Sequence, residues 1–324
     1  MRSAVATDPG RRRRHNEDAF VCDPPLFAIA DGMGGAQAGE VASGLAAAVL
    51  SESGGEGLGQ DRVASLIQEA NRRVFQRANE DAAASGMGTT MTVALVDAST
   101  GSIAIGHVGD SRAYRVRDGS LEQLTDDHSL VGELVRSGKL SEAEAESHPQ
   151  RSVITRAVGT EPEVDVDTFT VQAEPGDLYL LCSDGLTDMI PDREILALVD
   201  VDDLDGAARA LVDGANAGGG EDNITVVLFA LEPGVDEAGV AAGETARMPA
   251  AQDPAADEED TLSGLDPIPA VDTAVVPAAA IAEHLERAEA EAARPSPRRS
   301  ILPLLLLVLL IVAIALLAIW GLSR

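Results

Sequence analysis

The amino-acid sequence predicts an α+β domain in which sheet packs on sheet and helices lie outside. Three observations lead to this prediction. Short apolar runs of strand length follow one another in groups, and longer amphipathic patterns of helix length come in pairs. All five Phe and both Tyr precede residue 232, so the hydrophobic core belongs to the front of the chain.

The individual elements follow from the period of the apolar residues and from the turn residues between them. In chain order, we expect strands at 19–22 and 26–30, helices at 36–50 and 61–83, strands at 90–96, 102–108 and 113–117, helices at 129–137 and 141–146, strands at 164–171 and 177–182, two helices between 192 and 217, and a strand at 223–231. The three strands between 90 and 117 are joined by short turns, which predicts an antiparallel meander.

The folded domain is expected to end near residue 231. Residues 232–299 contain no aromatic residue and are rich in Ala, Pro and acidic side chains. Such a segment buries too little apolar surface to offset its chain entropy, so we predict a disordered linker, with a short helix near 278–293.

The end of the chain predicts a membrane anchor. Residues 301–320 are twenty consecutive residues without a charge, which is the length of a bilayer-spanning helix. We therefore expect a transmembrane helix at 300–321 and a short extracytoplasmic end at 322–324. Three arginines lie between 294 and 299. The positive-inside rule then predicts a single-pass protein of the cell membrane with residues 1–231 in the cytoplasm.

Charge and cysteine content exclude other classes of protein. The formal net charge of −30 disfavours binding to nucleic acid. The cysteines, Cys22 and Cys182, sit in apolar strand-like runs, and in a reducing cytosol we expect buried thiols rather than a disulfide.

Three aspartates lie at the ends of apolar runs. Asp31 and Asp184 each follow such a run and precede a glycine, and Asp222 precedes the last run. If the strands are neighbours, these carboxylates converge, and convergent carboxylates repel one another unless a cation lies among them. Oxygen ligands suit Mg²⁺ or Mn²⁺, and a pair of such ions activates water for displacement at phosphorus. The aspartates therefore predict a two-metal hydrolytic site.

Other phosphate chemistries lack their residues. A nucleotide-binding P-loop needs Gly-Lys-Ser/Thr, but Lys139, the only lysine, is followed by Leu140. Neither cysteine has an arginine six residues later, as a cysteine phosphatase requires. The chain also has no His-Glu-x-x-His motif and no Gly-x-Ser-x-Gly motif. Metal and carboxylate chemistry remains.

An ordered series of motifs carries a resemblance to a known family. The segments are Thr7–Asp18, Asp31–Gly35, Gly39–Ser43, Met87–Thr90, His107–Arg112, Ser183–Leu186 and Asp222–Thr225. In this order they resemble the motifs of the PPM family, the protein phosphatase 2C-like serine/threonine phosphatases, over nearly all of residues 1–231. Together with His148–Ser152, the linker and the membrane helix, they are similar to the membrane-anchored actinobacterial phosphatases that oppose receptor-type serine/threonine kinases.

The resemblance implies an α/β/β/α sandwich of two antiparallel sheets flanked by helices, with two Mn²⁺ or Mg²⁺ ions in a cleft at one end. By motif position, Asp31 bridges both ions and Asp184 and Asp222 complete the first. The carbonyl of Gly32 binds the second ion. The remaining matching positions, which contact the second ion or hold its waters, are Glu17 and Asp18.

Three further positions follow from the resemblance. A third ion is expected at Asp110, Ser152 and Asp184. Arg13 matches the phosphate-binding arginine, and its planar guanidinium suits a pair of phosphoryl oxygens. The catalytic residues are therefore predicted to be Arg13, Asp31 and Asp222.

One position departs from the family pattern. Animal members place a histidine after the Asp-Gly pair as the general acid, whereas this chain has Met33, which donates no proton. The proton donor is left open, with His15 as a candidate.

The sequence thus predicts a phosphatase that hydrolyses phosphoserine and phosphothreonine in proteins, including receptor-type kinases, while its C-terminal helix lies in the lipid bilayer. Two alternatives stay open: a catalytically weak scaffold that binds phosphoproteins, and a phosphatase that acts on an anti-sigma-factor antagonist in a stress switch.

Overall fold

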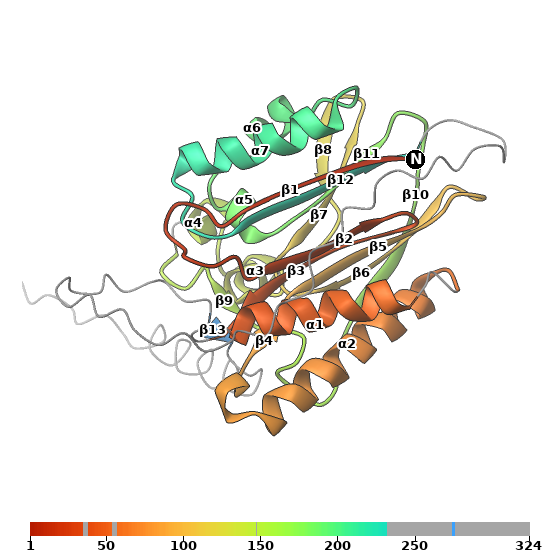
Figure 1. The fold of residues 1–324 in the computed structure, drawn as a ribbon. Coiled ribbons are helices and arrows are strands. Elements are labelled where there is room, and N and C mark those ends of the chain that lie inside the picture. The colour runs from red at the N-terminus through yellow and green to blue at the C-terminus, as the bar shows by residue number, and fades with distance from the viewer. Residues whose placement is uncertain (35–37, 54–56, 147, 232–273, 276–324) are drawn as a thin grey trace, which may run out of the picture. The chain divides into compact units, whose positions relative to one another are not determined.

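The computed structural model describes residues 1–34, 38–53, 57–146, 148–231 and 274–275. These residues form two antiparallel sheets that lie face to face, with helices on the outer side of each (Figure 1). The predicted α+β class and the sandwich of two sheets between helices are confirmed.

The first sheet has five strands within the described residues. Their spatial order is β1 (Arg2–Asp8), β12 (Ile224–Ala230), β11 (Leu178–Cys182), β7 (Arg112–Arg117) and β8 (Ser120–Gln123). The helices on this side are α5 (Asp184–Thr187), α6 (Asp192–Leu198) and α7 (Leu204–Gly218). Apolar residues of α7 recur at helical spacing, so Leu204, Leu211 and Ala215 pack onto the sheet.

The second sheet lies on the other side of the central core. In the described part of the chain its order is β10 (Asp167–Gln172), β6 (Ser102–Val108), β5 (Met91–Asp97), β3 (Leu26–Met33) and β2 (Asp18–Asp23), with β4 (Gly88–Thr89) paired to β3. Its outer face is covered by α1 (Ala38–Glu52) and α2 (Gln60–Glu80), followed by the short helix η1 (Ala82–Ala84). A Cβ at Gly106 would lie 2.3 Å from Val63, so glycine lets α2 approach the sheet closely.

Aromatic residues fill the space between the sheets. The rings of Phe27 on β3 and Phe229 on β12 stack with their centroids 4.2 Å apart, and Tyr179 stacks on Phe229 at 5.2 Å. Both cysteines are free and buried, as predicted. This core packs the two sheets against each other.

A smaller segment lies between β8 and β10 in the chain. It contains α3 (Leu130–Arg136), α4 (Glu142–Glu146) and β9 (Val153–Ile154). Ser129 caps α3 by accepting a hydrogen bond from the Gly132 N–H at 3.1 Å. Within the predicted linker, β13 (Ala274–Val275) pairs with β9 in parallel.

The predicted meander is wrong at its third strand. β5 pairs with β6, but β7 lies in the other sheet between β11 and β8. The residues between β6 and β7 therefore cross from one sheet to the other, and Gly109 makes the turn with φ +110°. The apolar period of a strand does not determine which sheet it joins, because both faces of β7 are covered.

The predicted membrane helix at 300–321, the end at 322–324 and the helix near 278–293 lie outside the described residues. In the part of the chain that the structure describes, no helix has the length and apolar character needed to cross a bilayer.

Candidate metal and phosphate site

Four of the predicted carboxylates lie at one end of the sandwich. Asp18 opens β2 directly opposite Asp31, which lies near the end of β3. Asp184 opens α5 after β11, and Asp222 precedes β12. Because β11 and β12 are antiparallel neighbours, Asp184 after β11 and Asp222 before β12 lie at the same end of their sheet. The structure thus brings together aspartates that are far apart in the sequence.

The carboxylates act on one another electrostatically. Burial raises the pKa of Asp31 well above its ordinary value, and the charges of Asp18, Asp184, Asp222 and Asp110 raise it further. The pKa of Asp184 is likewise raised well above its ordinary value, first by burial and then by Asp110 and Asp222. A group of buried like charges favours proton or cation uptake.

Asp18 is the most buried of these groups. Its side chain is held by hydroxyl donors, because Thr225 Oγ1 and Ser183 Oγ donate to Oδ2 at 2.6 and 2.9 Å. Even so, burial raises its pKa to about 6. Asp18 Oδ1 and Asp184 Oδ1 are buried without a hydrogen-bond partner among the described residues. Buried carboxylate oxygens without donors fit a site that holds cations.

Thr225→Val tests the support of Asp18. The substitution keeps the shape but removes the hydroxyl donor, so we expect it to lower the free energy of unfolding by about 1–3 kcal/mol at pH values where Asp18 is ionised. Urea unfolding measures this loss. Thr225→Ser keeps the hydroxyl and should be the milder change. Equal or higher stability of Thr225→Val would contradict the proposed role of this hydrogen bond.

The start of α1 packs tightly against the end of the sandwich that carries the aspartates. The Glu17 carbonyl accepts hydrogen bonds from the Gly32 N–H at 3.1 Å and from Ser43 Oγ at 2.6 Å. A Cβ at Gly32 would lie 2.2 Å from the Gly39 carbonyl oxygen, and a Cβ at Gly39 would lie 2.2 Å from Glu17 Oε2. The two glycines therefore allow Gly32 and the Glu17 carboxylate to lie together beside the aspartates.

Arg13 also lies at the carboxylate cluster. Its Nη2 donates to Asp222 Oδ2 at 2.8 Å, and 27% of its side chain is exposed. The opposite oxygen, Asp222 Oδ1, accepts from the backbone N–H of Asn223 at 2.8 Å. Arg13 is thus a partly buried cation at the edge of the site.

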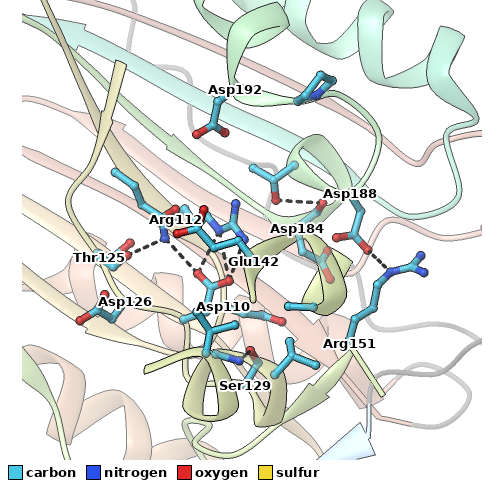
Figure 2. A pocket seen from close by; sticks show the side chains of 18 of the residues that line it. Asp110, Arg112, Thr125, Asp126, Ser129, Glu142, Arg151, Asp184, Asp188 and Asp192 are labelled. Carbon is cyan, nitrogen blue, oxygen red and sulfur yellow. Dashed lines mark hydrogen bonds and ion pairs between the residues drawn. The ribbon is translucent and has the colours of Figure 1, made fainter. Parts of the chain in front are cut away.

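The residues predicted for a third ion line one cavity of about 940 Å³. Asp110, Ser152 and Asp184 are part of its lining, and Figure 2 shows Asp110 and Asp184 beside it. Burial, followed by the charges of nearby aspartates, raises the pKa of Asp110 to about 7. Among the described residues, the lining does not include Asp31 or Asp222, so this cavity adjoins the main cluster on the Asp184 side.

Other residues of this cavity were missed by the sequence analysis. Arg112 Nε and Nη2 donate to the Asp127 carboxylate at 2.9 and 2.8 Å, and Arg151 pairs with Asp188 at 3.5 Å (Figure 2). The only signal for Arg112 was its place in the motif that contains Asp110. The partners lie far along the chain, where no local pattern marks them.

Met33 and His15 have different surroundings. Met33 is buried and packs with Ile154 and Ala157, so its side chain serves the core. His15 is exposed, and its backbone carbonyl accepts a hydrogen bond from Asn223. No contact between its imidazole and the carboxylates is found among the described residues.

In the described part of the chain, the carboxylates of the cluster do not form a complete set of metal ligands. Among the described residues, no group of three or more His, Cys, Asp or Glu side chains is gathered closely enough to hold a metal ion. The strand ends bring Asp31, Asp184 and Asp222 to the same end of the sandwich, but in the described part of the chain they do not form a complete ligand shell.

Comparison with known proteins identifies the family. The family model Protein phosphatase 2C matches residues 11–213. Serine/threonine phosphatase Stp of Listeria welshimeri is 40% identical over 241 residues, which cover 70% of this chain and 95% of Stp. Serine/threonine protein phosphatase PstP of Mycobacterium tuberculosis is 41% identical over 231 residues, which cover 70% of this chain and 44% of PstP.

Solved structures agree with the sequence comparison. The crystal structure of M. tuberculosis PstP matches with a TM-score of 0.68 and 39% identity over 72% of this chain and 99% of that one. A structure of the PstP catalytic domain in complex with two manganese ions matches with a TM-score of 0.65 and 36% identity over 70% and 96% of the two chains. The predicted family is confirmed: this chain belongs to the protein phosphatase 2C family of bacterial serine/threonine phosphatases.

Proposed function

We propose that this chain is a metal-dependent protein serine/threonine phosphatase whose carboxylate cluster holds two Mn²⁺ or Mg²⁺ ions. The observation that carries the proposal is the buried group formed by Asp18, Asp31 and Asp184. Their raised pKa values, and the buried oxygens of Asp18 and Asp184 without a donor, mark a site built for cations. The family and the two manganese ions of the similar PstP structure support the same enzyme class and the same metals.

Each residue has a role that fits its place. Asp31 lies among the other carboxylates and is assigned as the ligand shared by both ions, with Asp184 and Asp222 on one side. The Gly32 carbonyl, Glu17 and Asp18 are assigned to the other side.

Arg13 is assigned to the phosphoryl group of the substrate, whose oxygens its guanidinium binds in a bidentate manner. When bound, the ions activate a water molecule and offset the charge of the phosphoryl group. Asp110 and Ser152, which line the neighbouring cavity with Asp184, are assigned to a third ion.

The location of the enzyme is part of the proposal. The uncharged run at 300–321 anchors the chain in the cell membrane, and residues 1–231 lie in the cytoplasm. Tethering raises the effective concentration of the phosphatase near substrates that are also at the membrane. Receptor-type serine/threonine kinases and their membrane substrates are therefore the proposed targets.

Paired peptides test the proposed function. The full chain, freed of metal with EDTA, is given Mn²⁺ and two peptides of one sequence that carry phosphothreonine or phosphotyrosine. We expect phosphate release from the phosphothreonine peptide only, and only after Mn²⁺ is added. Release that EDTA does not affect, or release from phosphotyrosine alone, would contradict the proposal. Binding of the phosphothreonine peptide without turnover in excess Mn²⁺ would support the scaffold alternative.

A further inference from the structure

The side chain of Asn223 joins the two segments that carry the predicted phosphate site. It lies between Asp222 and β12 and is 4% exposed. Its Oδ1 accepts from the Glu17 N–H at 2.8 Å, and its Nδ2 donates to the carbonyls of Pro9 and His15 at 3.0 and 2.9 Å. One carboxamide therefore satisfies three backbone groups of a segment more than 200 positions away in the chain.

Among side chains of this size, only a carboxamide can both accept from the one backbone N–H and donate to the two backbone carbonyls. The orientation of the amide is fixed by the network, because oxygen faces an N–H and nitrogen faces two carbonyls. An aspartate in its place would set a carboxylate against two carbonyl oxygens, and an alanine would leave all three backbone groups without this partner. The sequence analysis noted Asn223 in its motif but gave it no role.

The segment that Asn223 holds carries Arg13. Asn223 binds the backbone on both sides of this arginine, at Pro9 before it and at His15 and Glu17 after it. A further hydrogen bond holds the same loop, because the Arg11 N–H donates to the Gly220 carbonyl at 2.7 Å. The path of the backbone around Arg13 is thus set by the residues that precede β12.

We infer that Asn223 is a positioning residue for Arg13. Asn223 directly follows Asp222 in the chain. By fixing the backbone at both ends of the loop, it sets the distance from the Arg13 guanidinium to the Asp222 carboxylate. A guanidinium binds a phosphoryl group well only when its position is held, and a displacement of about 1 Å costs up to about 100-fold in rate. Asn223 thus couples the phosphate-binding arginine to the carboxylate cluster.

Inhibition by inorganic phosphate tests this role in the full chain. We expect Asn223→Ala to raise the inhibition constant of phosphate and to lower kcat/KM, each by about 10- to 100-fold. If Asn223 acts through Arg13, the effects are not independent. The double variant Arg13→Ala/Asn223→Ala should then match Arg13→Ala within about twofold in both quantities. Losses that multiply in the double variant would overturn the inference.

Asn71 provides a matched control for general loss of stability. It is fully buried on α2 and makes the same three kinds of bond, accepting from the Gly159 N–H at 2.7 Å and donating to the carbonyls of Glu161 and Pro162 at 3.0 and 3.2 Å. Asn71→Ala should lower the melting temperature as Asn223→Ala does, while the inhibition constant of phosphate stays unchanged. An equal rise of this constant in both variants would mean that Asn223 is merely structural.

A second variant covers the case in which Asn223→Ala does not fold. Gly10 has φ +77°, and a Cβ there would lie 2.2 Å from the Asp222 carbonyl oxygen. Gly10→Ala therefore displaces the same loop while the Asn223 side chain is kept. We expect the same rise in the inhibition constant of phosphate, and the same absence of any further effect in the Arg13→Ala background. An unchanged constant in Gly10→Ala would overturn the inference.

This inference rests on the proposed function, and the experiment separates the two. If wild type releases no phosphate in Mn²⁺, the proposed function fails. If wild type is active and phosphate inhibits Asn223→Ala with the same inhibition constant as wild type, only the positioning role fails.

Discussion

Asp31→Asn is expected to abolish phosphate release and to stabilise the metal-free protein. Asp31 lies within the electrostatic reach of four other aspartates, which raise its pKa after burial has already raised it. A neutral amide of the same shape removes this repulsion but also removes the ligand assigned to both ions. We expect the rate to fall by roughly 10³-fold or more. The melting temperature in EDTA should rise, at about 2–4 °C for each kcal/mol of repulsion removed.

The two effects are measured on one sample, by phosphothreonine peptide hydrolysis in Mn²⁺ and by thermal unfolding in EDTA. Asp213→Asn on the exposed face of α7 is the matched control, because it removes one negative charge away from the cluster. It should change neither quantity appreciably. A metal-free Asp31→Asn protein that is less stable than wild type would show that the carboxylates do not repel one another as described.

In the metal-free protein, the carboxylate cluster is expected to contribute less stability as the pH rises through the range in which the cluster ionises. An aspartate with a raised pKa binds more protons in the folded state than in the unfolded state, so its ionisation favours unfolding. The pKa of Asp18 is raised from 3.8 to about 6 and that of Asp110 from 3.8 to about 7. The loss from these two groups therefore starts near pH 4 and is complete above about pH 7. For Asp18 alone it amounts to about 3 kcal/mol.

Aspartates with lowered pKa values act at lower pH. The pKa of Asp177 is lowered by its hydrogen bonds from Arg117 despite burial, and that of Asp167 is lowered by His128 and Arg156. These groups contribute stability above about pH 4 that is lost in stronger acid. The buried histidines His107 and His128 oppose the cluster, because burial lowers their pKa values, that of His107 from 6.5 to about 3. The stability that they contribute is lost as the pH falls through this range.

Thermal unfolding in EDTA between about pH 4 and pH 8 measures this profile. Saturating Mn²⁺ should abolish the contribution of the cluster to this profile, because a bound cation replaces the protons of the cluster. Asp18→Asn should flatten the part of the metal-free profile below about pH 6. A metal-free Asp18→Asn profile that runs parallel to the wild-type profile below about pH 6 would contradict the raised pKa of Asp18.

The sequence predicted most elements of the fold because apolar periodicity and turn residues mark them locally. It missed β1, in which Ala4 is the only fully buried residue, because the strand owes its structure to pairing with β12 at the opposite end of the chain. It also placed β7 in the wrong sheet, since the crossing at Gly109 depends on how the two sheets pack.

In the site, too, local sequence marked some residues, while the roles of others depend on contacts between distant segments. Asp31, Asp184 and Asp222 were found because they stand at the ends of apolar runs, within recognisable motifs. The roles of Thr225 and Asn223 were not found, although both lie in a motif that the sequence analysis singled out. Their partners, Asp18 and the loop around Arg13, lie about 200 positions away, and only the folded chain brings these groups within hydrogen-bonding distance.

The number of Mn²⁺ ions bound per chain shows whether the carboxylate cluster is a two-metal site. Equilibrium dialysis of wild type and Asp31→Asn against Mn²⁺ at about pH 8 measures it without reference to activity. The account predicts about two tightly bound ions in wild type, as in the similar PstP structure, and fewer than one in Asp31→Asn, because Asp31 is assigned to both ions. An unchanged number in Asp31→Asn, or no bound Mn²⁺ in wild type, would contradict it.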